Sequence, residues 1–341
     1  MSETASDLLP TPEDLTLDEI SQRFNTDEKA VAYLETLLWP HGPVCPHCGN
    51  ADAARIYKIK ANVTAEVRVG LHECAQCKKQ FRVTVGTIFE DSKVPLRKWL
   101  VAFYMVSSSK KGISSLQLQR NLGLSSYRTA LFMTHRIHHA LTSPQFAEPL
   151  KGDVEVDSTY IGGKTDVKAQ RELAPTFEQD ETGKWVRRPL LHKKMEVLSL
   201  QERGGQKRSI VMQRVTANDL QKAIAENVAP GSTLHTDSTQ LLKRKADPKY
   251  KHHTVVHSKK EYARKLPDGT VTHVNTLESS FGLLKRGLYG TFHSVSKKHL
   301  HRYVAEFDFR WNTRKKTDGE RTIAAVQGAK GKRLTLKEPK A

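Results

Sequence analysis

The cysteines are the feature that most constrains this chain. There are four, arranged as Cys45-x-x-Cys48 and Cys74-x-x-Cys77, with 25 residues between the pairs. Two thiolate pairs on tight turns can close a tetrahedron around one zinc ion. The alternative, redox-active CxxC motifs, usually accompanies a βαβ pattern, which is not evident here. The spacing therefore predicts a structural Zn²⁺ site that uses all four cysteines as ligands.

The zinc ligands fall in a region of short strand-like segments, residues 43–85. A helical pattern over residues 27–38 precedes them, so residues 27–90 are predicted to form a short helix and a zinc ribbon. His47 and His72 lie beside the cysteines. Because four thiolates already complete a tetrahedral site, both histidines are interpreted as surface residues.

Charge is unevenly distributed along the chain, whose net charge is +18. Residues 1–38 hold nine acidic and two basic residues, whereas residues 39–341 hold 28 acidic and 53 basic ones. The excess of basic residues within residues 39–341 favours a polyanionic partner, most simply nucleic acid. The same excess could instead serve only to keep the protein soluble. The polar, acidic residues 1–26 are predicted to be a flexible leader.

Helical patterns dominate residues 91–145. Within them, residues 112–141 predict a helix, a turn at Gly123 and a second helix capped by Ser125. Two short helices joined in this way are typical of a helix-turn-helix, so this region is predicted to bind DNA. Three residues open the second helix and are candidate DNA contacts: Ser126, Tyr127 and Arg128.

Strand and helix patterns follow one another in a set order over residues 152–314. Three strands come first, then a helix, two more strands and two long helical patterns. This order predicts an α/β domain of the ribonuclease H-like kind. Charged, proline-containing residues 164–190 are predicted to form an exposed insertion, and residues 315–341 a basic tail.

Three acidic residues fall where such a fold would bring them together. Asp157 lies in the first strand, Asp237 ends the fourth, and Glu278 lies in the first turns of a helix. The first and fourth strands of this fold are neighbours and the helix packs across the sheet, so the carboxylates can converge and bind two Mg²⁺ or Mn²⁺ ions. Each acid also has a structural interpretation: a solvated strand face shared with Glu155, a turn, or a helix N-terminus.

Several long sequence motifs resemble those of one family, the ISXO-like insertion-sequence transposases of bacteria. The words CPHCG, CAQCKKQF, GTIFEDSKVPLRKWL and SSKKGISSLQLQRNLGL resemble its zinc-ribbon and helical region. The words VEVDSTYIGGK, HTDS and HVNTLESSFGLLKRGLYGTF resemble its DDE domain. The resemblance implies that the catalytic acids are Asp157, Asp237 and Glu278. Ser158 and Phe281 depart from the family pattern, which has an acid and a tryptophan there.

The resemblance implies a DNA transposase, a polynucleotidyl transferase that binds the terminal inverted repeats of its element. It would cleave the DNA strands there and join them to target DNA with Mg²⁺ or Mn²⁺, as a homo-oligomer on DNA. Lys285 lies seven residues after Glu278 and hence on the same helix face. Lys285 and Arg286 are therefore candidate phosphate contacts.

Two other functions are compatible with these patterns. A domesticated, non-catalytic zinc-ribbon protein would bind DNA without cutting it, but all three acids are present. A structure-specific ribonuclease H-like nuclease would need no fused end-recognition region. No membrane-spanning stretch or signal peptide is visible, so a bacterial cytoplasmic location is expected, on the nucleoid when DNA is bound.

Overall fold

The computed structural model describes most of the chain. The described residues are 15–62, 68–142, 148–162, 177–179, 185–187, 194–213, 215–237, 247–267 and 269–335. They form two compact units. Unit 1 comprises Met1–Gln145 with Thr313–Ala341, and unit 2 comprises Phe146–Asn312.

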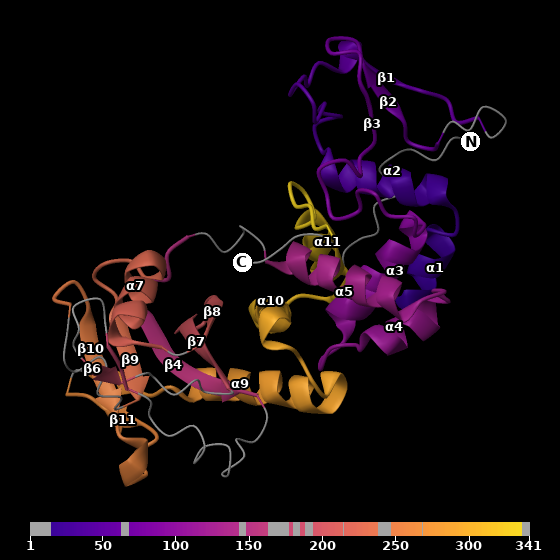
Figure 1. Ribbon diagram of the computed structural model, residues 1–341. Helices are drawn as coiled ribbons and strands as arrows, with labels where there is room; N and C mark the ends of the chain where they lie inside the picture. Colours follow the sequence, from indigo (N-terminus) through magenta and orange to yellow (C-terminus); the bar gives the residue numbers. More distant parts are fainter. Residues whose placement is uncertain are drawn as a thin grey trace. The chain divides into compact units, whose positions relative to one another are not determined.

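Unit 1 combines a helical body with the cysteine-containing ribbon (Figure 1). Its helices are α1 (Leu17–Arg23), α2 (Asp27–Leu38), α3 (Leu96–Ser108), α4 (Ser115–Leu122), α5 (Tyr127–Leu141) and α11 (Asp318–Gln327). Helix α3 buries Trp99, Leu100 and Phe103 on one face. The ribbon is an antiparallel sheet of β1 (Ile56–Lys58), β2 (His72–Cys74) and β3 (Gln80–Phe81), in the order β1-β2-β3.

Helix α1 corrects the prediction of a flexible leader for residues 17–23. Thr16 and Glu19 form a capping box at its start, and Ile20 is buried. One buried residue in seven leaves a weak periodic signal, and the acidic composition of the segment masks it. Residues 1–14 of the predicted leader lie outside the described residues.

Helix α11 corrects the prediction of a basic tail for residues 318–327. It contacts α3 and α5, and it buries Ala324, Ala325 and Val326. Beyond it, the Lys332 ammonium donates hydrogen bonds to the carbonyls of His139 and Ala140 at the end of α5. Small alanines leave little hydrophobic signal in sequence, although they allow close helix packing.

Helices α4 and α5 have the order predicted for the helix-turn-helix. Gly123 ends α4 in the left-handed region, at φ +56°, which confirms the predicted turn. The residue that caps α5 is Ser126 and not Ser125, since the Ser126 hydroxyl accepts the N–H of Thr129.

Unit 2 is built on a five-stranded mixed sheet. Its strands are β4 (Asp153–Ile161), β7 (Met195–Glu202), β8 (Lys207–Met212), β9 (Thr233–Asp237) and β10 (Lys251–Val255), in the order β10-β9-β4-β7-β8. Strand β7 runs antiparallel to its neighbours β4 and β8, whereas β9 runs parallel to both β4 and β10. The first and fourth predicted strands, β4 and β9, are therefore neighbours, as expected.

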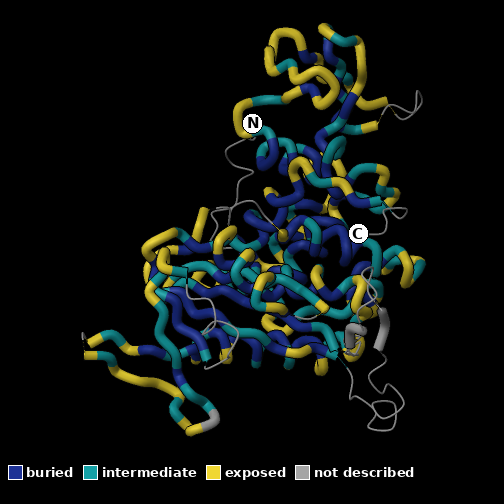
Figure 2. The backbone as a smooth tube through the Cα atoms, turned by 60° about the vertical axis from the view of Figure 1, so that its left-hand side comes forward, coloured by how far each residue is buried: buried dark blue, intermediate teal, exposed yellow. Residues whose placement is uncertain are grey.

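Helices cover both faces of this sheet, and buried residues of strands and helices together form the two cores (Figure 2). Helix α7 (Ala217–Asn227) packs against a core that includes Val154 and Val156 of β4. Helices α9 (Asn275–Gly287) and α10 (Leu300–Asn312) share the other core with Ile161. Because side chains alternate along a strand, Glu155 and Asp157 project to the α9 side.

Unit 2 also contains two short hairpins and a π-helical turn. A hairpin of β11 (Arg264–Lys265) and β12 (Val271–Thr272) leads into α9, and a π-helical turn, Leu288–Phe292, follows that helix. A second hairpin, β5 (Phe177–Gln179) with β6 (Trp185–Arg187), lies in the predicted insertion. The remainder of residues 164–190 lies outside the described residues.

Candidate functional site

The four cysteines of the ribbon form one compact cluster. The sulfurs of Cys45 and Cys77 are 3.6 Å apart, and those of Cys48 and Cys74 are 3.7 Å apart. Four thiolates about 2.3 Å from a central zinc ion would have separations close to these values. The arrangement therefore fits a tetrahedral metal site with the four predicted ligands.

Polar groups around Cys74 favour its thiolate form. Burial works to raise the pKa of Cys74, but N–H groups of Cys77, Gln76 and Asn50 hydrogen-bond the sulfur and lower the pKa to about 6. A thiolate is the form of cysteine that binds metal.

The two neighbouring histidines differ in environment. His47 is exposed, as predicted. His72 is buried, which corrects its interpretation as a surface residue. Its ring stacks on Phe81 and meets the edge of Trp39, with ring centroids 5.7 Å and 5.4 Å apart. His72 is therefore part of the small core that supports the two turns carrying the cysteines.

In unit 2, Asp157 and Asp237 lie side by side on adjacent strands. The parallel pairing of β4 with β9 aligns Val156 with Thr236, and each aspartate is the next residue of its strand. Strand β10 pairs with the far side of β9, where Val255 is aligned with Asp237. The sheet register therefore brings the two acids to the same level.

Glu278 joins them from α9, the helix that covers this face of the sheet. Its carboxylate oxygen Oε1 lies 3.3 Å from Nδ1 of His257, and the same nitrogen lies 3.8 Å from Oδ2 of Asp237. His257 thus bridges two of the three predicted acids. It follows β10 by two residues, and sequence reasoning missed it because a lone histidine after a strand has no spacing that marks it.

Asp157 is the most buried acid of the cluster. Burial raises its pKa to about 6, and the negative charges of Asp237 and Glu278 add to this shift. The Ser158 N–H, which donates to Asp157, and the nearby His257 oppose it. A cation between the carboxylates would relieve this repulsion.

The three carboxylates are less tightly grouped than the cysteines. Among the described residues, only the four cysteines place three or more potential ligand atoms within 4.8 Å of one another. Two-metal sites hold their ions about 3.5–4 Å apart and so spread their ligands more widely than a single-ion site. The carboxylate donor set fits that wider arrangement.

Ser158 and Phe281, which depart from the expected family pattern, have clear structural partners. The Ser158 hydroxyl donates to Glu196 Oε1 at 2.7 Å, and Glu196 Oε2 accepts the backbone N–H of Val215. Phe281 is buried in α9, with the Lys207 ammonium 5.6 Å from its ring centre. Neither residue displaces a predicted carboxylate.

The burial of Glu155 contradicts the interpretation that this face of β4 is exposed to solvent. Its side chain is fully buried, and its Oε1 lies 3.2 Å from Arg203 Nε. The alternation of side chains along β4 correctly placed Glu155 on the same face as Asp157. It does not, however, distinguish a solvent-exposed face from one that a helix covers.

The predicted DNA contacts occupy two separate places. Ser126, Tyr127 and Arg128 form the start of α5 in unit 1, where Tyr127 and Arg128 are exposed. Lys285 and Arg286 lie in the last turn of α9 in unit 2, two turns beyond Glu278.

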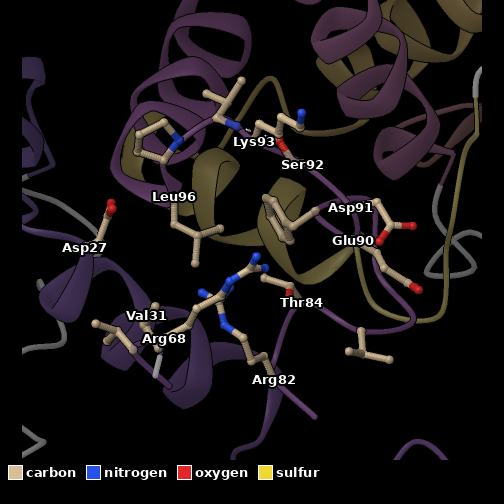
Figure 3. Close-up of a pocket in the computed structure, with 15 residues that line it drawn as sticks. Asp27, Val31, Arg68, Arg82, Thr84, Glu90, Asp91, Ser92, Lys93 and Leu96 are labelled. Carbon is tan, nitrogen blue, oxygen red and sulfur yellow. Dashed lines mark hydrogen bonds between the residues drawn. The ribbon is translucent and has the colours of Figure 1, made fainter. Parts of the chain in front are cut away.

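A pocket of unit 1 has a mixed lining. Its volume is about 840 Å³. In Figure 3, Arg68 and Arg82 occupy the middle, with Asp27 on one side and Glu90 on the other. Burial and the neighbouring Arg68 lower the pKa of Arg82. Since acids and bases both line it, the pocket has no simple preference for an anion.

Comparison with known proteins gives two family matches. Residues 149–312 match the ISXO2-like transposase domain, and residues 25–80 match the transposase zinc-ribbon domain. A protein described as an uncharacterized protein in transposable element ISH50 of Halobacterium salinarum is 28% identical over 291 residues. That alignment covers 84% of this chain and 91% of the archaeal protein.

No solved structure matches the chain. No described helix is long and apolar enough to cross a membrane. The transposase-domain match contains β4, β9 and α9, the elements that carry Asp157, Asp237 and Glu278, and the zinc-ribbon match contains all four cysteines. The chain therefore carries an ISXO2-like DDE transposase domain, preceded by a transposase zinc ribbon.

Proposed function

We propose that this protein is a DNA transposase that cleaves the ends of its element and joins them to target DNA. The observation that carries the proposal is the gathering of Asp157, Asp237 and Glu278 between one face of the mixed sheet and helix α9, within the matched domain. The strand order and the helix on each face support a ribonuclease H-like fold for unit 2.

The carboxylates would hold Mg²⁺ or Mn²⁺, which would activate the attacking hydroxyl and stabilise the leaving 3′ oxygen. Asp157 and Asp237 are fixed relative to each other by the β4–β9 pairing. His257 lies against both Asp237 and Glu278 and orients their carboxylates. No side chain needs to form a covalent intermediate with DNA in this scheme.

Cations near the carboxylates support a DNA substrate. Lys259 and Lys260 lie two and three residues after His257, and Lys265 lies on the β11–β12 hairpin; all three are exposed. Lys285 and Arg286 lie farther along α9. Such side chains would contact the phosphate backbone beside the cleavage site without reading its sequence.

Unit 1 would recognise the DNA ends of the transposable element. The four cysteines would bind Zn²⁺ and thereby fold the ribbon, which has a small core. Helix α5 would be the recognition helix, with Ser126, Tyr127 and Arg128 at its N-terminal end, the part of such a helix that contacts base edges. Assembly as a homo-oligomer on DNA would bring two ends together.

The test compares charge-removing variants of the three acids in strand cleavage and strand transfer on labelled end DNA. Asp157→Asn, Asp237→Asn and Glu278→Gln should each abolish both steps while end binding persists. Glu226→Gln, an exposed carboxylate on α7 in the same unit, is the matched control and should retain activity.

Each alternative function has its own outcome in this assay. A non-catalytic DNA-binding protein would bind the ends without cutting them, even before any substitution. A nuclease would cut the strands but never join them. Near-normal cleavage by all three variants would refute the proposed mechanism.

A further inference from the structure

Helix α9, which carries Glu278, begins without a cap of its own. Its N-cap residue is Val274, which has no side-chain acceptor. Helix α7 of the same unit shows the usual arrangement, in which the Thr216 hydroxyl accepts the Asp219 N–H. The first N–H groups of any helix need an acceptor from elsewhere. The start of α9 therefore depends on another element.

That element is β4, through the buried carboxylate of Glu155. Its Oε2 accepts the backbone N–H of Leu277 at 3.1 Å, and its Oε1 accepts the Thr276 hydroxyl at 2.8 Å. Leu277 is the third residue of the helix, whose N–H a capping side chain ordinarily binds. The negative charge is also favourable at a helix N-terminus. Glu155 thus acts as a cap supplied from the sheet.

Arg203 compensates the buried charge and extends the connection. Its Nε lies 3.2 Å from Glu155 Oε1, and its two terminal nitrogens donate to the carbonyls of Val271 and His273. A buried carboxylate is stable only when paired and hydrogen-bonded in this way. The chain from residue 271 to residue 277 is consequently fixed to the sheet at several points.

The position of Glu278 follows directly from this attachment. Glu278 comes next after Leu277, and its N–H donates to the Val274 carbonyl, within the turn that Glu155 caps. Glu155 is also two residues from Asp157 on β4 and projects to the same face. One strand therefore carries one acid of the site and anchors the helix turn that carries another.

We propose that Glu155 is a positioning residue, which sets the distance between Glu278 and Asp157 by capping α9 from the sheet. The inference rests on the proposed function in one respect, that Glu278 is a metal-binding carboxylate. It adds that the geometry of the metal site depends on a buried side chain that is not one of the three proposed metal ligands. Groups of this kind typically change metal affinity by 10–100-fold when removed.

The sharpest variant is Thr276→Val, which keeps the shape of the side chain and removes its hydrogen bond to Glu155. The full-length, zinc-loaded chain is titrated with Mn²⁺, and the signal lost in Asp157→Asn defines the carboxylate site. Thr276→Val should weaken Mn²⁺ binding there by about tenfold and speed amide exchange in the first turn of α9. Thr276→Ser, which retains a hydroxyl, should restore both.

Thr216→Val is the matched control, since it removes the cap of α7 and costs a similar amount of stability. It should leave Mn²⁺ binding and α9 exchange unchanged. Glu155→Gln is the second variant, because it keeps the size and an acceptor oxygen but loses the charge; it should also weaken Mn²⁺ binding.

The outcomes distinguish failure of the positioning role of Glu155 from failure of the proposed transposase function. Normal Mn²⁺ binding by the unaltered chain, with equally tight binding by Thr276→Val and Glu155→Gln, would overturn the positioning role alone. No Mn²⁺ binding to the carboxylates of the unaltered chain would instead refute the proposed function, and the inference with it. An equal loss of Mn²⁺ affinity in Thr216→Val would show a general stability effect and overturn the positioning role.

Discussion

At the scale of single residues, Arg136 shows how one charged side chain connects distant parts of unit 1. It lies on α5, is buried, and donates to the carbonyls of Ile88, Glu90 and Leu334. Its guanidinium also lies 4.5 Å from the centre of the Phe132 ring. Two chain segments that are far apart in sequence, residues 88–90 and the segment around Leu334, therefore depend on this side chain for carbonyl hydrogen bonds.

Arg136→Met should destabilise unit 1 by roughly 3 kcal/mol, because it leaves buried carbonyl groups without a donor. The midpoint of urea unfolding, followed by a probe in unit 1, measures the change. Arg128→Met is the matched control, since Arg128 is exposed on the same helix, and its effect should stay within about 0.5 kcal/mol. Equal midpoints for the two variants would contradict the role given to Arg136.

Cys74→Ser should remove the metal from the ribbon and unfold it while unit 2 remains folded. Structural zinc contributes on the order of 10 kcal/mol of folding free energy in small domains. Metal analysis of the purified chain, combined with limited proteolysis of residues 43–85, checks this. A chain without zinc whose ribbon still resists protease would disprove the metal site.

Cysteine spacing predicted the ribbon cluster, and the strand and helix pattern with the family resemblance predicted the three acids, but neither predicted the contacts of His257 or Glu155. Cysteine spacing is local and chemically specific, and the acids follow recognisable strand and helix patterns. The contacts of His257 arise only because β10 pairs in parallel beside β9, which no local pattern encodes. Glu155 became a helix cap through contacts with residues more than 100 positions away.

At the scale of elements, helix caps determine where several helices of unit 1 begin. Ser126→Ala should destabilise unit 1 by about 1 kcal/mol, because the Thr129 N–H loses its acceptor. The adjacent Ser125→Ala is the control, since that exposed serine does not cap α5. Thermal unfolding of the two variants decides the matter, and a larger loss for Ser125→Ala would contradict the assignment.

Long, strongly patterned elements were predictable, whereas short or alanine-rich ones were not. The predicted helix over residues 27–38 coincides with α2, and the predicted strand order of unit 2 is present. Helices α1 and α11 were missed because their burial involves few large apolar side chains. Tertiary packing, and not periodicity, is what makes these two segments helical.

At the scale of the whole molecule, the basic character of residues 39–341 sets the dependence of DNA binding on salt. A protein that neutralises several phosphates should lose about 10³-fold or more in affinity for its end DNA between 50 and 200 mM salt. A titration of labelled end DNA at a series of salt concentrations measures the slope. Affinity that hardly changes over this range would exclude phosphate contacts as the main source of binding.

The discontinuity of unit 1 has a consequence for how the protein is made. Unit 1 is interrupted after Gln145 and resumes at Thr313, so all of unit 2 is synthesised in between. Synthesis proceeds at about 5–20 residues per second, so roughly 10–30 s pass between the synthesis of α5 and that of α11. During this time the faces of α3 and α5 that α11 covers remain uncovered. During that interval the nascent chain can complete the sheet of unit 2 with its carboxylates while unit 1 still lacks α11. Neighbouring nascent chains could exchange α11 at this stage, and a chaperone that shields α3 and α5 would prevent it.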